Sequence, residues 1–226
     1  MSRPPLTHAA ALACALALSL ASCGGSSGGG KEAQATTAPA APCTRVAVPG
    51  PKREPRLTAP RSTLDPSRAY TATVVTNCGA FSFRLDVRRA PRTASSFYSL
   101  ARHGFYDGTQ FHRVARGFVI QGGDPKGDGT GGPGYRVVEK PPADASYTRG
   151  VVAMAKAGNE PPGASGSQFF VVTGEDAGLP PEYALLGRVT SGQAVVDRIG
   201  ALPTEPPGDG RPSPPVVISK LSAVAS

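Results

Sequence analysis

Few side chains in this 226-residue sequence could act as a nucleophile, a general base or a metal ligand. Of three histidines, His8 lies in an N-terminal apolar stretch, His103 at the end of a predicted helix and His112 inside an apolar strand. No Gly-x-Ser-x-Gly segment presents a serine. The cysteines lack the nearby histidine pair that would complete a tetrahedral metal site. We therefore expect no metal, no cofactor and no covalent catalysis.

One charged residue stands out because of its surroundings. Arg113 follows Phe111 and His112 in an otherwise apolar strand. Since arginine is rarely buried without a partner, its position requires either an ion pair or a chemical task. An ion pair is the plainer explanation. A guanidinium facing a cleft would instead offer several N–H donors to a bound molecule.

A glycine-rich segment suggests a nucleotide site only superficially. Gly127–Gly132 matches the G-x-G-x-x-G pattern letter for letter. The dinucleotide fingerprint must follow a strand and open a helix, whereas Pro133-Gly134 comes next. We interpret the segment as a tight glycine loop.

The elements that must position these residues are mostly short strands. Residues 81–87 alternate apolar and polar side chains, which predicts a half-buried strand, and residues 70–76 form a second one joined by a turn at 77–79. Pro91 opens a helix that Gly104 closes, and a shorter helix follows Ser191. Further apolar runs, each bounded by Gly, Pro or Asp, predict strands at 118–121, 150–155, 168–173, 183–189 and 216–221. Many strands with two helices indicate an antiparallel barrel.

Four segments together resemble the cyclophilin family of peptidyl-prolyl isomerases. They are Phe111-His112-Arg113, Gly117–Asp124, Ala153-Met154-Ala155 and Gly166–Phe170, and their order and spacing hold from about Tyr70 to Ile218. The resemblance implies a mainly β fold, a closed eight-stranded antiparallel barrel capped by two α-helices.

The resemblance also implies roles for individual residues. Arg113 is similar to the catalytic arginine of the family. The other matching positions bind substrate: Phe118, Val119 and Phe170 line the proline pocket, Gln121 and Ala155 contact the substrate backbone, Gln168 lies at the pocket edge, and Leu179 and Tyr183 form the rim.

The chemistry implied is rotation about the bond that precedes proline. Amide resonance opposes rotation with a barrier of about 18–20 kcal/mol. In the twisted state the prolyl nitrogen regains its lone pair, so a guanidinium beside it would bind that state preferentially. This role requires that Arg113 face the cleft and not be held by an acidic neighbour.

The sequence departs from the family pattern at the pocket rim. Gly178 stands where cyclosporin-sensitive relatives have tryptophan, Tyr183 replaces a histidine, and Lys156 replaces an asparagine. We therefore expect weak cyclosporin binding and an altered substrate preference.

The N-terminus has the features of an export signal. Arg3 precedes an apolar run at residues 9–21, too short to span a bilayer stably. The run ends in Leu20-Ala21-Ser22-Cys23, which resembles the lipobox of bacterial lipoproteins. We expect cleavage after residue 22, lipidation of Cys23, and an extracytoplasmic protein anchored to the bacterial cell membrane. A plain secretory leader is the alternative.

Three regions follow from this reading: a signal peptide at 1–22, a lipidated cysteine with a flexible Gly/Ala/Pro-rich tether at 23–65, and the isomerase domain at 66–226. Cys43 and Cys78 form an even pair in an oxidising compartment, so a disulfide is favoured over two free thiols. The formal net charge is +8, but the basic residues are scattered. We therefore expect no nucleic-acid partner.

The sequence thus predicts a peptidyl-prolyl cis–trans isomerase that assists the folding of exported polypeptides. Its partners would be proline-containing polypeptides and, through the lipid, the membrane; we expect a monomer. The alternative is a non-catalytic proline-binding or chaperone module tethered to the membrane. A structural envelope protein would leave Arg113 and Gln121 unexplained.

Overall fold

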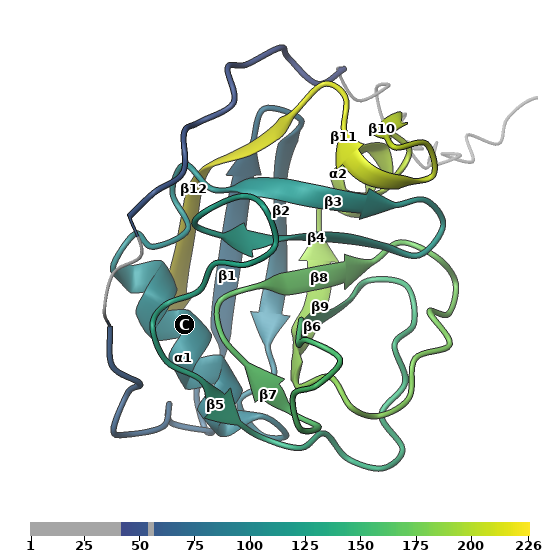
Figure 1. Ribbon diagram of the computed structural model, residues 1–226. Coiled ribbons are helices and arrows are strands. Elements are labelled where there is room, and N and C mark those ends of the chain that lie inside the picture. The colour runs from purple at the N-terminus through teal and green to yellow at the C-terminus, as the bar shows by residue number, and fades with distance from the viewer. Residues whose placement is uncertain (1–41, 54–56) are drawn as a thin grey trace, which may run out of the picture. The chain divides into compact units, whose positions relative to one another are not determined.

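Eight strands close into an antiparallel barrel in the computed structural model, which describes residues 42–53 and 57–226 (Figure 1). These strands are β1 (Tyr70–Thr76), β2 (Gly79–Leu85), β3 (Gln110–Ala115), β4 (Val119–Asp124), β6 (Val151–Met154), β8 (Phe169–Val172), β9 (Leu185–Ser191) and β12 (Val216–Ala225). Around the ring their order is β3-β12-β1-β2-β9-β6-β8-β4, and β4 pairs with β3 to close it. The predicted fold class is confirmed.

Two helices accompany the barrel, and both occur where the sequence predicts them. Helix α1 (Pro91–Arg102) has its proline in the first turn, where the missing N–H costs nothing. Gly104 follows this helix with φ +66°, a conformation that glycine adopts without strain. Helix α2 spans Gln193–Gly200. Figure 1 shows α1 at the lower left of the barrel and α2 at its top.

Four further strands are too short for the sequence pattern to indicate. β5 (Val137–Val138) and β7 (Ala164–Ser165) form a separate two-stranded sheet. β10 (Thr204–Glu205) and β11 (Asp209–Pro212) form a hairpin whose second strand extends the barrel at the edge of β3. This pairing brings the chain after α2 next to the strand that carries Arg113.

The strands opposite β1 are buried on both faces. In β8, Phe169 and Val171 belong to the inner core, whereas Phe170 and Val172 belong to a second, outer apolar cluster. Because successive side chains of a strand point to opposite faces, a strand buried on both sides has a continuous apolar sequence. The outer cluster also contains Val119 of β4 and Ala153 of β6. It therefore lies outside the barrel wall over β4, β8 and β6.

The second half of the predicted tether makes contacts that the sequence pattern does not indicate. Residues 42–53 and 57–65, which we call the strap, bond to the barrel domain at several points. Cys43 forms a disulfide with Cys78, and Thr44 exchanges backbone and side-chain hydrogen bonds with Asn77. An irregular segment can thus be held by its polar groups.

Lys52 is the strongest polar anchor of the strap. Its ammonium donates to the carbonyl oxygens of Phe105 and Asp107 at 2.9 and 2.6 Å, and its backbone N–H donates to Pro125 O. Burial lowers the pKa of Lys52, an effect that the charge of Asp107 opposes. Farther along, the backbone N–H of Leu57 donates to Pro133 O. The strap thus supports both ends of the glycine loop.

The predicted leader and Cys23 lie outside the described residues. Among the residues that the structure does describe, no helix is long and apolar enough to cross a membrane.

We predict that Cys43→Ala/Cys78→Ala lowers the free energy of unfolding by about 3–4 kcal/mol, because the bridge closes a loop across a sequence separation of 35 residues. Urea denaturation of the mature chain measures the change. Reductant should destabilise the wild-type protein by a similar amount and leave the double variant unchanged. Equal stability of the wild-type protein and the double variant in the absence of reductant would contradict the prediction.

Candidate active site

The site begins with a row of side chains across three neighbouring strands. Arg113 of β3 lies opposite Gln121 of β4, and Gln121 lies opposite Phe170 of β8. Residues directly opposite each other in a ladder point to the same face. The fold therefore places one cation, one amide and one aromatic ring side by side on the outside of the barrel.

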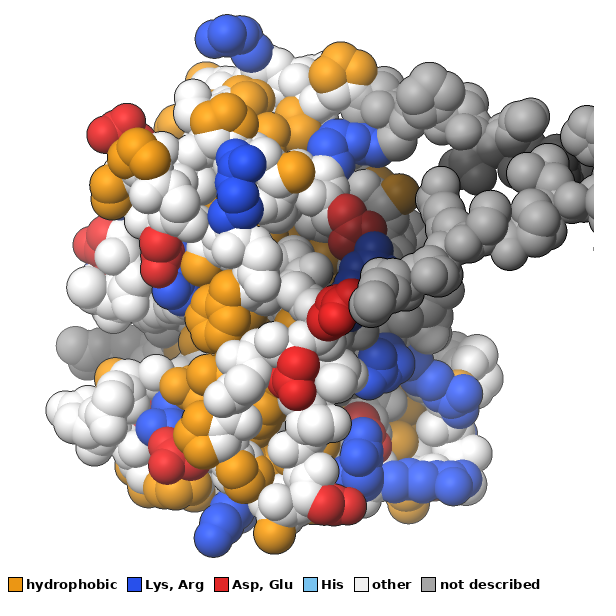
Figure 2. Space-filling view, turned by 90° about the vertical axis from the view of Figure 1, so that its right-hand side faces the viewer, with side chains coloured by type: hydrophobic (Ala, Val, Ile, Leu, Met, Phe, Trp, Pro, Cys, Tyr) orange, Lys and Arg blue, Asp and Glu red, His pale blue; other side chains and the backbone are white. Residues whose placement is uncertain are grey.

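A small cavity of about 130 Å³ opens beside this row. It is smaller than the roughly 300–1,000 Å³ of typical small-molecule sites, so it suits a single side chain or ring. Its lining contains all the predicted catalytic and substrate-binding residues except Gln168, and in addition Lys156. The predicted residues in the lining are Arg113, Phe118, Val119, Gln121, Ala155, Phe170, Leu179 and Tyr183. We call it the ring pocket. On the face seen in Figure 2, hydrophobic side chains gather in the middle, with Lys and Arg at the lower right.

The rim of the ring pocket is held by a buried tyrosine. The Tyr147 hydroxyl donates to Tyr183 O at 2.7 Å and accepts the N–H of Tyr183 at 3.0 Å. The ring of Tyr183 stands edge-on to Phe170, with centroids 5.6 Å apart. Tyr183, which replaces the expected histidine, thus has a fixed backbone and packs against the pocket wall.

Lys156 fixes the same rim from the other side. Its side chain is only 4% exposed, and its ammonium pairs with Glu182 at 3.2 Å and lies 5.5 Å from the centroid of the Tyr183 ring. A cation near an aromatic face stabilises the ring's position. Lys156, which replaces an asparagine of the family pattern, lines the pocket.

Arg113 faces the ring pocket but is also held by an acidic neighbour. Its Nε and Nη2 atoms donate to the two carboxylate oxygens of Asp209, both at 2.7 Å. Asp209 belongs to β11 and lies 96 residues away in sequence. The requirement that Arg113 have no acidic partner is therefore not met, and the ion pair considered as the plainer explanation is present.

The pair nevertheless leaves part of the guanidinium free. Arginine carries five N–H donors. Asp209 accepts two of them, and Gln121 Oε1 accepts one from Nη1 at 3.2 Å. No described residue accepts the remaining N–H of Nη1 or of Nη2. Because Arg113 lines the pocket, these two donors are available to a bound molecule.

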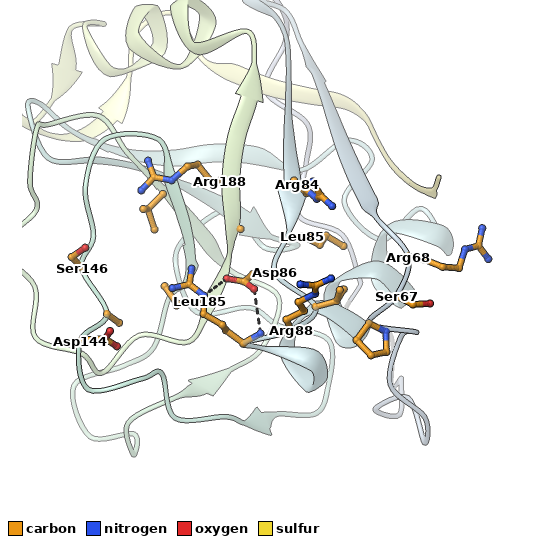
Figure 3. A pocket seen from close by; sticks show the side chains of 16 residues that line it. Ser67, Arg68, Arg84, Leu85, Asp86, Arg88, Asp144, Ser146, Leu185 and Arg188 are labelled. Atoms are coloured by element: carbon orange, nitrogen blue, oxygen red, sulfur yellow. Dashed lines mark hydrogen bonds and ion pairs between the residues drawn. The ribbon is translucent and has the colours of Figure 1, made fainter.

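The structure also contains two larger cavities. One, of about 540 Å³, is lined by several arginines and shares no residue with the ring pocket (Figure 3). The other, of about 550 Å³, adjoins the ring pocket and shares Ala155 and Lys156 with it.

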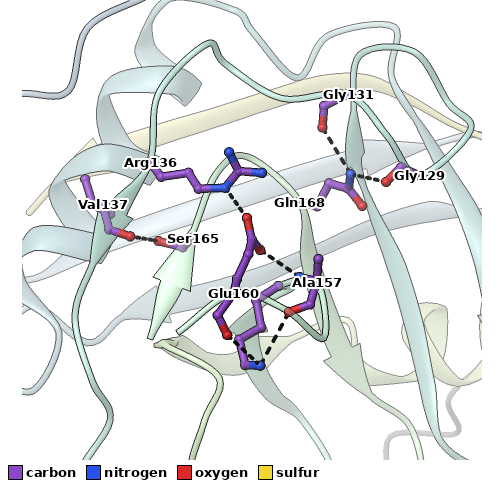
Figure 4. Close-up of polar contacts among 9 residues, drawn as sticks. Gly129, Gly131, Arg136, Val137, Ala157, Glu160, Ser165 and Gln168 are labelled. Atoms are coloured by element: carbon purple, nitrogen blue, oxygen red, sulfur yellow. Dashed lines mark hydrogen bonds and ion pairs between the residues drawn. The ribbon is translucent and has the colours of Figure 1, made fainter. Parts of the chain in front are cut away.

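The second cavity contains the partner of Gln121. Gln121 donates to Gln168 Oε1 at 3.0 Å, and Gln168 Nε2 donates to Gly129 O and Gly131 O at 2.9 and 3.1 Å (Figure 4). The glycine loop is therefore a structural anchor for the site. Its own conformation is held by Asp124, whose carboxylate accepts the N–H groups of residues 126, 128 and 129.

His112 does not take part in the site. Its side chain is buried and does not line the ring pocket. Burial lowers the pKa of the imidazole, an effect that Asp124 opposes. The ring is thus neutral near pH 7. Among the residues described, no group of three or more His, Cys, Asp or Glu side chains could hold a metal ion.

Comparison with known proteins assigns the class. Residues 71–223 match the family described as "Cyclophilin type peptidyl-prolyl cis-trans isomerase/CLD". "Peptidyl-prolyl cis-trans isomerase B" of Streptomyces anulatus is 41% identical over 168 residues, which cover 66% of this chain and 94% of that protein. "Probable peptidyl-prolyl cis-trans isomerase A" of Mycobacterium leprae is 39% identical over 170 residues, covering 67% and 91%.

A solved structure agrees with the sequence relatives. A Cryptosporidium parvum cyclophilin-type isomerase, solved in the presence of the dipeptide Ala-Pro, superposes with a TM-score of 0.63 at 29% identity and covers 69% of this chain and 99% of its own. A closed barrel with an outer ring pocket and a guanidinium at its wall defines an isomerase of the cyclophilin class. The chain belongs to the cyclophilin-type peptidyl-prolyl cis-trans isomerase family.

Proposed function

We propose that this chain accelerates rotation about X–Pro bonds in exported polypeptides, with the prolyl ring in the ring pocket and the guanidinium of Arg113 beside the prolyl nitrogen. The observation that carries the proposal is the position of Arg113, which lines the same cavity as Phe118, Val119 and Phe170 and has two N–H donors that no described residue accepts. The roles proposed for the surrounding residues rest on their positions in the lining of the same cavity.

The pocket would act by binding the ring and excluding water. Phe118, Val119 and Phe170 offer apolar surface to the prolyl ring. Gln121 lines the ring pocket, and its amide is held by Arg113 and Gln168, so its second N–H would be the donor to the substrate backbone. Water stabilises the flat, dipolar amide, so removing it favours the twisted state in which the nitrogen has regained its lone pair.

Arg113 would supply the interaction that exists only in the twisted state. A flat amide nitrogen has no lone pair to accept a hydrogen bond, whereas the pyramidal nitrogen does. A charge-assisted hydrogen bond contributes roughly 1.5–3 kcal/mol, which corresponds to about 10- to 150-fold in rate. Since only the transition state gains it, the bond accelerates the step rather than tightening substrate binding.

Asp209 would act as a positioning residue for Arg113. A half-exposed arginine loses considerable rotamer entropy when it is fixed, and a bidentate carboxylate fixes both the plane and the direction of the guanidinium. The side chains of Arg113 and Asp209 are 36% and 53% exposed. The pair therefore contributes little to stability, and its main consequence is orientation.

We predict that Arg113→Ala lowers kcat/KM about 10- to 150-fold in a protease-coupled proline-peptide assay, because the hydrogen bond to the twisted amide is lost. The fall should occur in kcat, with the melting temperature nearly unchanged. Arg113→Lys keeps the charge but not the planar fork, so it should recover only part of the rate. Unchanged activity in Arg113→Ala would overturn the proposed mechanism, whereas a wild-type protein that does not accelerate the exchange would favour a non-catalytic proline-binding module.

We predict that Asp209→Asn lowers kcat by about three- to tenfold with little change in KM, because asparagine has one acceptor oxygen in place of two, so one of the two hydrogen bonds from Arg113 is lost and the other is weakened. Asp197→Asn is the matched control. It breaks the ion pair of Asp197 with Arg149, whose side chains are similarly exposed, away from the ring pocket. A rise in kcat in Asp209→Asn would mean that the carboxylate competes with the substrate for Arg113.

The lipid anchor and the extracytoplasmic location belong to the same proposal. They rest on the apolar leader and the lipobox-like segment that ends at Cys23. The disulfide between Cys43 and Cys78 supports an oxidising compartment, since stable disulfides are rare in the cytosol. A folding enzyme tethered there would meet polypeptides as they emerge unfolded.

We predict that mass spectrometry of the mature protein from a bacterial host finds Cys23 as the first residue and carrying lipid. Cys23→Ala should abolish the added mass and release the protein from the membrane fraction. Cys14→Ala is the control, because that residue leaves with the leader and its loss should change neither result. A mature N-terminus at any other residue would refute the anchor.

A further inference from the structure

The arginine-lined cavity in Figure 3 has no part in the proposed isomerisation. It lies where β2 ends and β9 begins, between the segment at 66–68, the turn at 86–89 and the segment at 144–146. Its volume is about 540 Å³, and it shares no lining residue with the ring pocket. Its floor consists of the buried side chains Leu85, Val87, Val151 and Leu185.

Positive charge predominates around this cavity. Five arginines line it, against two carboxylates: Arg68, Arg84, Arg88, Arg89 and Arg188, with Asp86 and Asp144. Asp86 already accepts the Nε of Arg89 at 2.6 Å and the backbone N–H of the same residue. The lining therefore retains four other cationic side chains and one other carboxylate, Asp144.

Two of these arginines are placed directly against each other. Arg84 of β2 is the cross-strand partner of Arg188 of β9, and both are exposed on the outer face. Like charges in such a position destabilise a sheet. Arg188 is held by Thr148 Oγ1 and Arg149 O at 3.0 and 2.9 Å. A bound anion would remove the repulsion that this arrangement creates.

Two other arginines of the cavity, Arg84 and Arg88, have unused donors. The side chains of Arg84 and Arg88 form no hydrogen bond or ion pair with any described residue. Figure 3 shows Asp86 between Arg188 on one side and Arg84 and Arg88 on the other. Guanidinium groups from three separate segments thus border one hollow, which suits an anion with several acceptor oxygens.

We propose that this cavity binds a phosphate-bearing anion. The arginine fork matches phosphate geometry, and a phosphate can accept from more than two guanidinium groups at once, whereas a carboxylate has only two oxygens. The five arginines of the lining exceed its two carboxylates by three positive charges, which is more than one carboxylate group of a ligand could neutralise. The phosphate can come from a soluble molecule or from an anionic lipid headgroup, and the test separates these sources.

The test uses the mature chain, residues 23–226, with Cys23→Ser so that no lipid is attached. Pyrophosphate is titrated into the isotope-labelled protein, and amide shifts are followed by NMR. We expect saturable binding that weakens as salt is raised, with the largest shifts in β2, β9 and residues 86–89. In parallel, co-sedimentation compares vesicles that contain phosphatidylglycerol with vesicles of phosphatidylcholine alone.

The decisive comparison is between two double variants of equal net charge. Arg84→Gln/Arg88→Gln should weaken pyrophosphate binding at least about tenfold, since two charge-assisted contacts are lost. Arg45→Gln/Arg102→Gln removes two exposed arginines that do not line the cavity, and it should bind as the parent does. Both variants should retain isomerase activity, which shows that they are folded.

Each outcome bears on the proposal. Binding of pyrophosphate lost only in Arg84→Gln/Arg88→Gln supports a site for soluble phosphates. Binding only of phosphatidylglycerol vesicles, with the same variant dependence, supports the lipid headgroup as the source. The proposal is overturned if neither probe binds, if both variants lose binding equally, or if a polyglutamate peptide binds more tightly than pyrophosphate.

Discussion

The arrangement of one guanidinium organises this site. Arg113 is held on one edge by Asp209 and meets Gln121 on another. Gln121 is in turn fixed by Gln168, and Gln168 by the carbonyl groups of the glycine loop. The strap bonds to both ends of that loop at Pro125 and Pro133. A cation that must meet a transient lone pair is therefore oriented by contacts from distant parts of the chain.

The apolar pocket follows from the burial of the barrel wall on both faces. The outer residues of β4, β6 and β8 would be exposed if nothing covered them. Tyr147 and the segment at 177–183 pack over them. The ring pocket is the place where this cover is incomplete, so its walls are rigid barrel side chains and its rim is a loop held by hydrogen bonds. This arrangement favours a fixed pocket with an adaptable entrance, and it explains how the rim can change while the floor is kept.

The fold and the pocket could be predicted because their signals are local. Strict alternation in β2 and apolar runs in β4 and β8 indicate strands directly, and the motifs around Arg113 point to one family. Asp209 could not be found in this way. It meets Arg113 only because β11 pairs with β3 over two residues, a contact with no trace in a Gly-Asp-Gly segment. The strap was missed for a related reason: lack of periodicity excludes regular structure but not tertiary hydrogen bonds.

An ion pair at Arg113 is compatible with catalysis because Asp209 has a weak effect on the charge of the guanidinium and a strong effect on its direction. Asp209 is more than half exposed, so water and salt screen its field at the more distant prolyl nitrogen. The proposed hydrogen bond from Arg113 to that nitrogen would be a contact interaction and would be screened much less. The carboxylate thus reduces the effective charge modestly while it fixes the plane of the guanidinium strongly. The two N–H groups that no described residue accepts belong to the terminal nitrogens, so the pair occupies one edge of the guanidinium and leaves donors on the others.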